Sequence, residues 1–488
     1  MLLSSRRRLR AALLAAASAT LVAAALPSPT PLGIGDPLFP HLGNPGYDVV
    51  SYDIALTYNG TNTTPLDAVT RIDAVATQRL DRINLDFTHG TVSEVVVNGL
   101  PAEFATAGED LVVEPAVALQ RGSQVRITVA HTSDPRGAAS AGGWVRTGDG
   151  LAMANQADAA HRVFPSNDHP ADKAYFTFRI TAPSELTAVA NGLAESKHRN
   201  GTTTTTWSYR TTHPMATELA QVSIGSSAVV DRQGPGGLPV RDVVPAKDRD
   251  RLEKWLAKTP GQLEWMEEKA GPYPFETYGV LVADADTGYE LETQTLSLFE
   301  RSLFTNPAYP EWYVDSIMVH ELAHQWFGNS VSPRTWSDLW LNEGHATWYE
   351  ALYAEEKSGH TVESRMREAY KHSDQWRTDG GPPAAPKPPA PGKKISLFRP
   401  VVYDGSALAL YALRQTIGKE AFEQLERTWV SEHRDGTATT ADFTALASEI
   451  AGRDLSVFFR EWLYGQRTPA MPGHPDWRTT APKQAAAR

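Results

Sequence analysis

The sequence contains no cysteine among its 488 residues. This absence excludes disulfide scaffolds, iron–sulfur clusters, cysteine-ligated zinc and thiol nucleophiles, so any metal must be held by histidine and carboxylate side chains. An excess of positive charge is also missing, because 57 acidic against 46 basic residues give a net charge of −11. No basic stripe runs along the chain, and we expect no nucleic-acid partner. The length favours two or three domains.

Long hydrophobic runs are missing beyond the first 26 residues. There, four arginines between positions 6 and 10 precede an apolar run of about 16 residues that ends in small side chains. This order predicts a signal peptide over residues 1–26, and hence a secreted or extracytoplasmic protein with no stable membrane insertion after cleavage. An uncleaved anchor is the alternative, although a spanning helix needs roughly 20 residues. The consecutive arginines leave twin-arginine export open.

Residues 44–245 alternate between apolar and polar side chains. Tyr52, Ile54 and Leu56 illustrate this period of two, and Asn-Gly pairs at 59–60, 98–99 and 191–192 mark turns between strands. We therefore predict an N-terminal all-β domain.

Residues 246–475 are dominated by helical spacing and predict a second, mostly helical domain. Thr259 and Pro260 indicate the N-cap and first turn of a helix, and Gly271 indicates its end. One strand is expected over residues 278–282. Residues 379–394 carry six prolines without periodicity, which predicts a mobile loop inside this domain.

The motif His320-Glu321-x-x-His324 lies in a segment with an apolar helical face. Two histidines four residues apart on a helix project from the same face, so both imidazoles can bind one zinc ion. Glu321 then lies beside the metal, where it can act as a general base.

A third ligand candidate, Glu343, follows 19 residues after His324, at the start of a second predicted helix. Two antiparallel helices can bring this carboxylate to the same metal. Two imidazoles and one carboxylate leave a fourth position for water, which is typical of catalytic zinc. The alternative is a pair of buried structural histidines beside a surface glutamate.

With these motifs and the sequences around them, the chain resembles the aminopeptidase N family of zinc metallopeptidases, which includes leukotriene hydrolase. The resemblance spans about residues 44–475. It rests on the zinc motif, 326–329 (Trp-Phe-Gly-Asn), 340–344 (Trp-Leu-Asn-Glu-Gly), Tyr403, and Gln156 followed by 164–170. Tyr289-Glu290-Leu291-Glu292-Thr293 stands where the family has Gly-Ala-Met-Glu-Asn.

The resemblance implies an α+β multidomain fold, with a saddle-like all-β domain followed by a thermolysin-like, mostly helical domain. It also implies a short form without the C-terminal helical domain of larger relatives. One zinc ion per chain would be bound by His320, His324 and Glu343. The implied function is a secreted aminopeptidase in which Glu321 assists attack by zinc-bound water.

The same resemblance assigns three further roles. Tyr403 would donate a hydrogen bond to the oxyanion, Glu292 would bind the free N-terminus of a peptide substrate, and Gln156 would offer a second acceptor to that ammonium group. A thermolysin-type endopeptidase, a non-catalytic zinc- or peptide-binding surface protein and a non-peptide hydrolase such as an epoxide hydrolase remain alternatives.

Three neighbouring side chains complete the sequence-based expectations. Asp338 is expected either to orient a zinc-bound imidazole or to cap the second helix. His345 is expected to pack rather than to bind metal. Glu290 is expected to point away from the side of the segment that Glu292 occupies.

Overall fold

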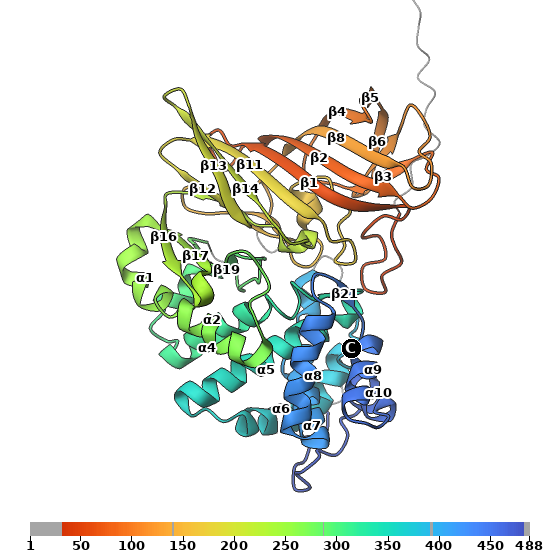
Figure 1. Ribbon diagram of the computed structural model, residues 1–488, viewed down its shortest axis with the longest axis vertical. Coiled ribbons are helices and arrows are strands. Elements are labelled where there is room, and N and C mark those ends of the chain that lie inside the picture. Colours follow the sequence, from red (N-terminus) through yellow and green to blue (C-terminus); the bar gives the residue numbers. More distant parts are fainter. Residues whose placement is uncertain (1–31, 139–140, 286, 391–393, 483–488) are drawn as a thin grey trace, which may run out of the picture.

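The computed structural model describes residues 32–138, 141–285, 287–390 and 394–482. The expected signal peptide therefore lies outside the described residues, as do residues 391–393 of the expected proline-rich loop. The fold is α+β: a β-rich N-terminal part lies against one end of a mostly helical part (Figure 1). This arrangement confirms the predicted fold class.

An eight-stranded sheet forms the largest layer of the β-rich part. Its strand order is β13-β14-β11-β1-β2-β8-β4-β5. The strands are β1 (Tyr47–Thr57), β2 (Leu66–Ala76), β4 (Val92–Val97), β5 (Leu100–Pro101), β8 (Gln124–Ser133), β11 (Tyr175–Pro183), β13 (Leu193–Asn200) and β14 (Thr204–Arg210). Tyr52, Ile54 and Leu56 are buried while their neighbours are partly exposed, so one face of β1 packs on the core.

Two smaller sheets cover the buried face. One has the order β12-β15-β10-β9 and the other β3-β7-β6. Their strands are β3 (Ile83–Asp86), β6 (Glu103–Ala107), β7 (Asp110–Glu114), β9 (Gly143–Arg146), β10 (Leu151–Ala154), β12 (Thr187–Ala190) and β15 (Val222–Gly225). Several of these strands are buried along their whole length, which a strand between two layers requires.

A four-stranded sheet crosses the predicted boundary at residue 245. Strands β16 (Ser227–Gln233) and β17 (Pro239–Pro245) pair with each other, and β17 runs parallel to β18 (Val280–Ala283), which pairs with β19 (Ser297–Glu300). The last two strands belonging to residues 44–245 thus share a sheet with the second part of the chain. The sequence indicated only one strand near 278–282 because β19 is a four-residue buried strand without alternation.

Ten α-helices, three short 3-10 helices and a two-stranded sheet form the remaining regular structure of the described second part. The helices are α1 (Arg249–Leu256), α2 (Thr259–Ala270), α3 (Arg301–Thr305), α4 (Glu311–Ala323), α5 (Trp340–Ser358), α6 (Val362–Gly380), α7 (Asp404–Ile417), α8 (Lys419–Glu432), α9 (Thr440–Ile450) and α10 (Ser456–Tyr464), with β20 (Ser332–Pro333) and β21 (Thr437–Ala438). The N-cap of α2 is Lys258, so the prediction of Thr259 as the cap was wrong by one residue.

Residues 32–46 connect the two parts. Asp36 accepts hydrogen bonds from the backbone N–H groups of Leu38, Phe39 and Trp336, at 2.8 to 3.0 Å. Leu38 and Phe39 pack with Trp336 and Val402 in a small apolar cluster. We call residues 32–46 the N-terminal strap, because they hold the β-rich part against the segment that precedes Tyr403.

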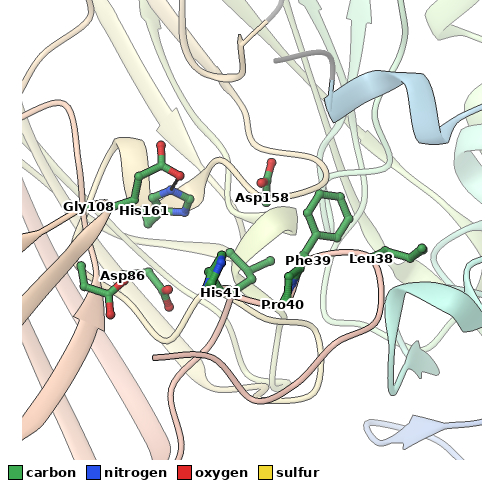
Figure 2. Close-up of a pocket in the computed structure, with 11 residues that line it drawn as sticks. Leu38, Phe39, Pro40, His41, Asp86, Gly108, Asp158 and His161 are labelled. Carbon is green, nitrogen blue, oxygen red and sulfur yellow. Dashed lines mark ion pairs between the residues drawn. The ribbon is translucent and has the colours of Figure 1, made fainter. Parts of the chain in front are cut away.

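The strap also closes a cavity of about 350 Å³ in the β-rich part. Figure 2 shows Leu38, Phe39 and His41 along one side of this cavity and Asp86 and His161 on the other. The His161 ring bonds to the Asp168 carboxylate at 2.6 Å. None of the predicted metal ligands lines this cavity.

As for membrane association, no helix in the described part of the chain is long and apolar enough to span a bilayer.

Candidate metal and active site

His320, His324 and Glu343 converge at the point where helices α4 and α5 pack together. The two Nε2 atoms are 3.3 Å apart, and each lies 3.4 Å from Oε2 of Glu343. Tetrahedral zinc with bonds near 2.0–2.1 Å requires ligand atoms about 3.3–3.4 Å apart. The donor set and its spacing therefore fit zinc with one position left open.

Each histidine is oriented by a bond to its other ring nitrogen. His320 Nδ1 lies 3.1 Å from Oε2 of Glu350, and His324 Nδ1 lies 3.1 Å from the carbonyl oxygen of Phe327. These acceptors fix Nδ1 as the protonated atom and leave Nε2 free for metal.

Glu350 is a functional side chain that sequence reasoning missed. It lies seven residues after Glu343 on α5, which places both on one helical face, and this spacing was the available signal. Arg365 donates to both Glu350 oxygens and to Asp404, at 2.7 to 3.3 Å. Burial opposes ionisation of Glu350, but Arg365 and His320 outweigh it and lower the Glu350 pKa to about 2.

Two glycines allow this close packing. A Cβ on Gly344 would lie 2.7 Å from the Ser406 Cβ, so only glycine lets the start of α7 approach α5 beside Glu343. Gly328 has φ +126° and lies against Asn342 and His324, where the chain turns sharply after α4. At both positions a larger side chain would collide with residues that pack around the site.

Glu321 is buried beside the metal ligands. Its Oε2 atom has no hydrogen-bond partner among the described residues. Burial raises the pKa of the Glu321 carboxyl to about 8. The Glu321 carboxyl therefore binds a proton more tightly than an exposed glutamate does.

Tyr403 lies beside His320, with ring centroids 6.0 Å apart. It is the N-cap residue of α7, and the preceding Val401 and Val402 are buried in the cluster that the N-terminal strap completes. Burial and the surrounding carboxylates raise the Tyr403 pKa well above its usual value. The phenol therefore keeps its proton and can donate a hydrogen bond.

Glu292 lies next to Glu321 and the candidate metal ligand His324. Carboxylate and imidazole atoms of Glu292, Glu321 and His324 lie within 4.8 Å of one another. The Glu292 backbone oxygen accepts hydrogen bonds from Gln325 at 3.1 Å and Asn329 at 2.6 Å, which hold the segment against the end of α4.

Gln156 reaches Glu292 from the β-rich part. Its amide nitrogen donates to Oε1 of Glu292 at 2.7 Å. In this arrangement Gln156 is a donor to Glu292, whereas the sequence-based expectation gave its oxygen to a substrate ammonium. The contact brings the two predicted residues together.

The structure gives different outcomes for the expectations on Asp338, His345 and Glu290. Asp338 accepts hydrogen bonds from the backbone N–H and the hydroxyl of Thr440, at 2.8 to 2.9 Å, and so stabilises the start of α9. It does not cap α5, and its bonds go to Thr440 rather than to a zinc-site imidazole. His345 is buried, stacks on Phe327 and bonds to Glu426, as expected of a packed residue.

The expectation for Glu290 was wrong. Side chains alternate along an extended segment, so residues two apart share a face. Leu291 is buried in the core, and the charge of Glu290 acts on His320, Glu321 and Tyr403. Glu290 and Glu292 therefore both face the site.

Comparison with known proteins gives the family. Residues 255–462 match the Peptidase family M1 domain, and residues 49–219 match the Peptidase M1 N-terminal domain. The chain belongs to the M1 peptidase family. Zinc is the cofactor of M1 peptidases, and the donor set described above fits one ion in this M1 chain.

Solved M1 structures resemble the whole described fold. The M1 zinc metallopeptidase from Deinococcus radiodurans superposes with a TM-score of 0.78 at 26% identity, covering 90% of this chain and 99% of that one. A mutant of that protein bound to a Tyr-Ser-Ala substrate gives a TM-score of 0.79, with 91% and 100% covered.

Curated M1 relatives are much longer. Aminopeptidase M1-B from Oryza sativa subsp. japonica is 26% identical over 65% of this chain and 37% of its own length. Aminopeptidase N from Streptomyces lividans is 26% identical over 62% of this chain and 36% of its own length. This M1 chain thus matches about a third of the length of these relatives.

Proposed function

We propose that this chain is a zinc aminopeptidase that removes single residues from the free N-terminus of peptides. The observation that carries the proposal is the position of Glu292, whose carboxylate lies within 4.8 Å of Glu321 and of the metal ligand His324. An anion so close to the base and metal fixes where a substrate ammonium group binds.

The distance also limits how much substrate precedes the scissile bond. An α-amine nitrogen lies about 2.5 Å from the carbonyl carbon of its own residue, and each further residue adds roughly 3.3–3.6 Å. With the amine bound at Glu292, one residue reaches the metal site. A thermolysin-type endopeptidase has no need of an anion at this point.

In the proposed reaction, a zinc ion held by His320, His324 and Glu343 would supply a Lewis acid for the scissile carbonyl and for water. Glu321 accepts the proton of the attacking water and passes it to the leaving amine. The Tyr403 phenol donates a hydrogen bond to the oxygen that becomes negative in the transition state. Glu292 binds the substrate ammonium and Gln156 holds the Glu292 carboxylate in place.

We also propose that the chain is exported, because residues 1–26 combine a basic start, an apolar run and small residues before Pro27. Mass determination of the mature N-terminus from culture medium tests this, and an intact Met1 on the exported chain would contradict cleavage.

A comparison of free and N-acetylated peptides tests the exopeptidase proposal. Acetylation removes the positive charge that Glu292 binds, so kcat/KM should fall at least about tenfold, the scale of one lost charge-assisted bond. Glu292→Ala should slow cleavage of free peptides and have little effect on blocked ones. Product masses should show one residue removed at a time.

Glu321→Gln serves as the inactive control, since an amide cannot act as a base while zinc content should stay unchanged. Internal cleavage of acetylated peptides at rates comparable to those of free peptides would favour the endopeptidase. Peptide binding without turnover by the zinc-loaded parent would favour the binding protein.

A further inference from the structure

Glu290 places a second carboxylate beside the candidate active site. The Leu291 backbone forms two hydrogen bonds with Leu298, at 2.9 and 2.7 Å, which fix this short segment. The Leu291 side chain is fully buried, so the side chains on either side of it, Glu290 and Glu292, are directed to the opposite face. Glutamate here stands where the family motif has alanine.

The two carboxylates lie toward different metal ligands. Among charged neighbours, Glu292 is influenced most by His324, and Glu290 is influenced most by Glu300 and next by the metal-ligand candidate His320. His320 lies one turn before His324 on α4, so the line from Glu292 to Glu290 runs toward the start of that helix. A substrate anchored at Glu292 and extended along this line passes the metal and then reaches Glu290.

An aromatic side chain lies farther along the same line. Tyr313 precedes His320 by seven residues, or about 10.5 Å along α4, on the same helical face. The charge of Glu290 also acts on Tyr313, and the Tyr309 ring lies 5.5 Å from the Tyr313 ring. A carboxylate beside aromatic faces is a chemically suitable site for an organic cation.

The part of the chain that the structure describes places no lysine or arginine in an ion pair with Glu290, which is partly exposed. Arg365, which acts on Tyr313, is already bound by Glu350 and Asp404. Burial and Glu300 raise the pKa of Glu290 to about 7, so a bound cation would stabilise its charged form.

We propose that Glu290, with the ring of Tyr313, selects substrates whose second residue is lysine or arginine. This inference rests on the proposed aminopeptidase function. Positions 290 and 292 are about 6.6 Å apart along an extended segment, close to the distance from a bound N-terminus to the side chain of the second residue. The scissile bond then precedes a basic side chain.

The experiment compares zinc-loaded parent and Glu290→Gln on three peptides, Ala-Lys-Ala, Ala-norleucine-Ala and Ala-Glu-Ala. Norleucine matches the lysine stem without its charge. For the parent, kcat/KM should be about tenfold or more higher with lysine than with norleucine, and lowest with glutamate. Glu290→Gln should bring the lysine and norleucine values within about twofold of each other, and Glu290→Lys should favour glutamate.

Glu264→Gln, an exposed glutamate on α2, is the matched control and should keep the parent's lysine preference. Equal parent rates for lysine and norleucine would overturn the inference while leaving the aminopeptidase intact. The inference would also be overturned if Glu290→Gln changed the selectivity for the first residue of the peptide and left the selectivity for the second residue unchanged. Failure of the parent to cleave any free peptide would instead refute the proposed function. If a variant does not fold, the parent's preference for lysine over norleucine still tests the inference.

Discussion

At the scale of single residues, Tyr403 provides the sharpest test of transition-state stabilisation. Its phenol remains protonated beside His320, and the oxygen that it would contact gains negative charge only as the transition state forms. Tyr403→Phe should therefore raise the activation free energy by about 2.7–4 kcal/mol. This lowers kcat and leaves KM nearly unchanged. Steady-state kinetics on a free peptide measure this, and a rise in KM alone would make Tyr403 a binding residue.

Glu350 should act through His320 rather than on the substrate. It accepts the Nδ1 proton of His320 and is itself held by Arg365. Glu350→Gln weakens the orientation of that imidazole, so zinc affinity should fall about 10–100-fold.

Chelator competition measures the zinc affinity of this variant, and excess zinc should restore most of its activity. Unchanged affinity would show that α5 and α4 packing alone orients His320. Glu264→Gln again serves as the comparison.

At the scale of elements, the N-terminal strap connects the β-rich part to the segment before Tyr403. Asp36 is 3% exposed and accepts bonds from three backbone N–H groups and from His169. Asp36→Ala leaves these donors without an acceptor, and the free energy of unfolding should fall by about 2–5 kcal/mol.

Denaturant unfolding measures this loss. Because the strap packs on Val402, kcat should also fall while zinc content stays constant. A stability loss below about 0.5 kcal/mol, the range of ordinary surface substitutions, would show that the strap is not structurally important.

At the scale of the whole molecule, Lys173 joins the two parts of the chain. From the β-rich part it donates to the backbone oxygens of Asn329, Ser330 and Gly436, at 2.8 to 3.4 Å. Burial lowers the Lys173 pKa to about 8. The three carbonyls lie in the loop that follows α4 and in the loop that precedes β21. Lys173 therefore connects the β-rich part to the back of the zinc site.

Lys173→Met keeps most of the side-chain volume but removes all three bonds. We expect the free energy of unfolding to fall by about 1–3 kcal/mol and the two parts to unfold in separate steps. Calorimetry measures both effects, with exposed Lys371→Met as the control. A single transition at the parent's temperature would contradict this role.

The sequence by itself determined the chemistry of the metal site. His320 and His324 are four residues apart, a spacing that any α-helix places on one face, so local geometry sufficed to predict their grouping. The alternation around Tyr52 and the shift to helical spacing after residue 245 likewise follow from local periodicity. These features depend on neighbours in the chain, which a sequence displays directly.

Only the tertiary structure decided which distant side chains meet. Gln156 and Glu292 come from different parts of the molecule, and Glu350 reaches His320 only because α5 packs against α4. The sequence also suggested that Asp338 serves the zinc site or α5, whereas it binds Thr440 at the start of α9. Such contacts join residues remote in sequence, and packing of whole elements sets them because no local periodicity records a neighbour a hundred residues away.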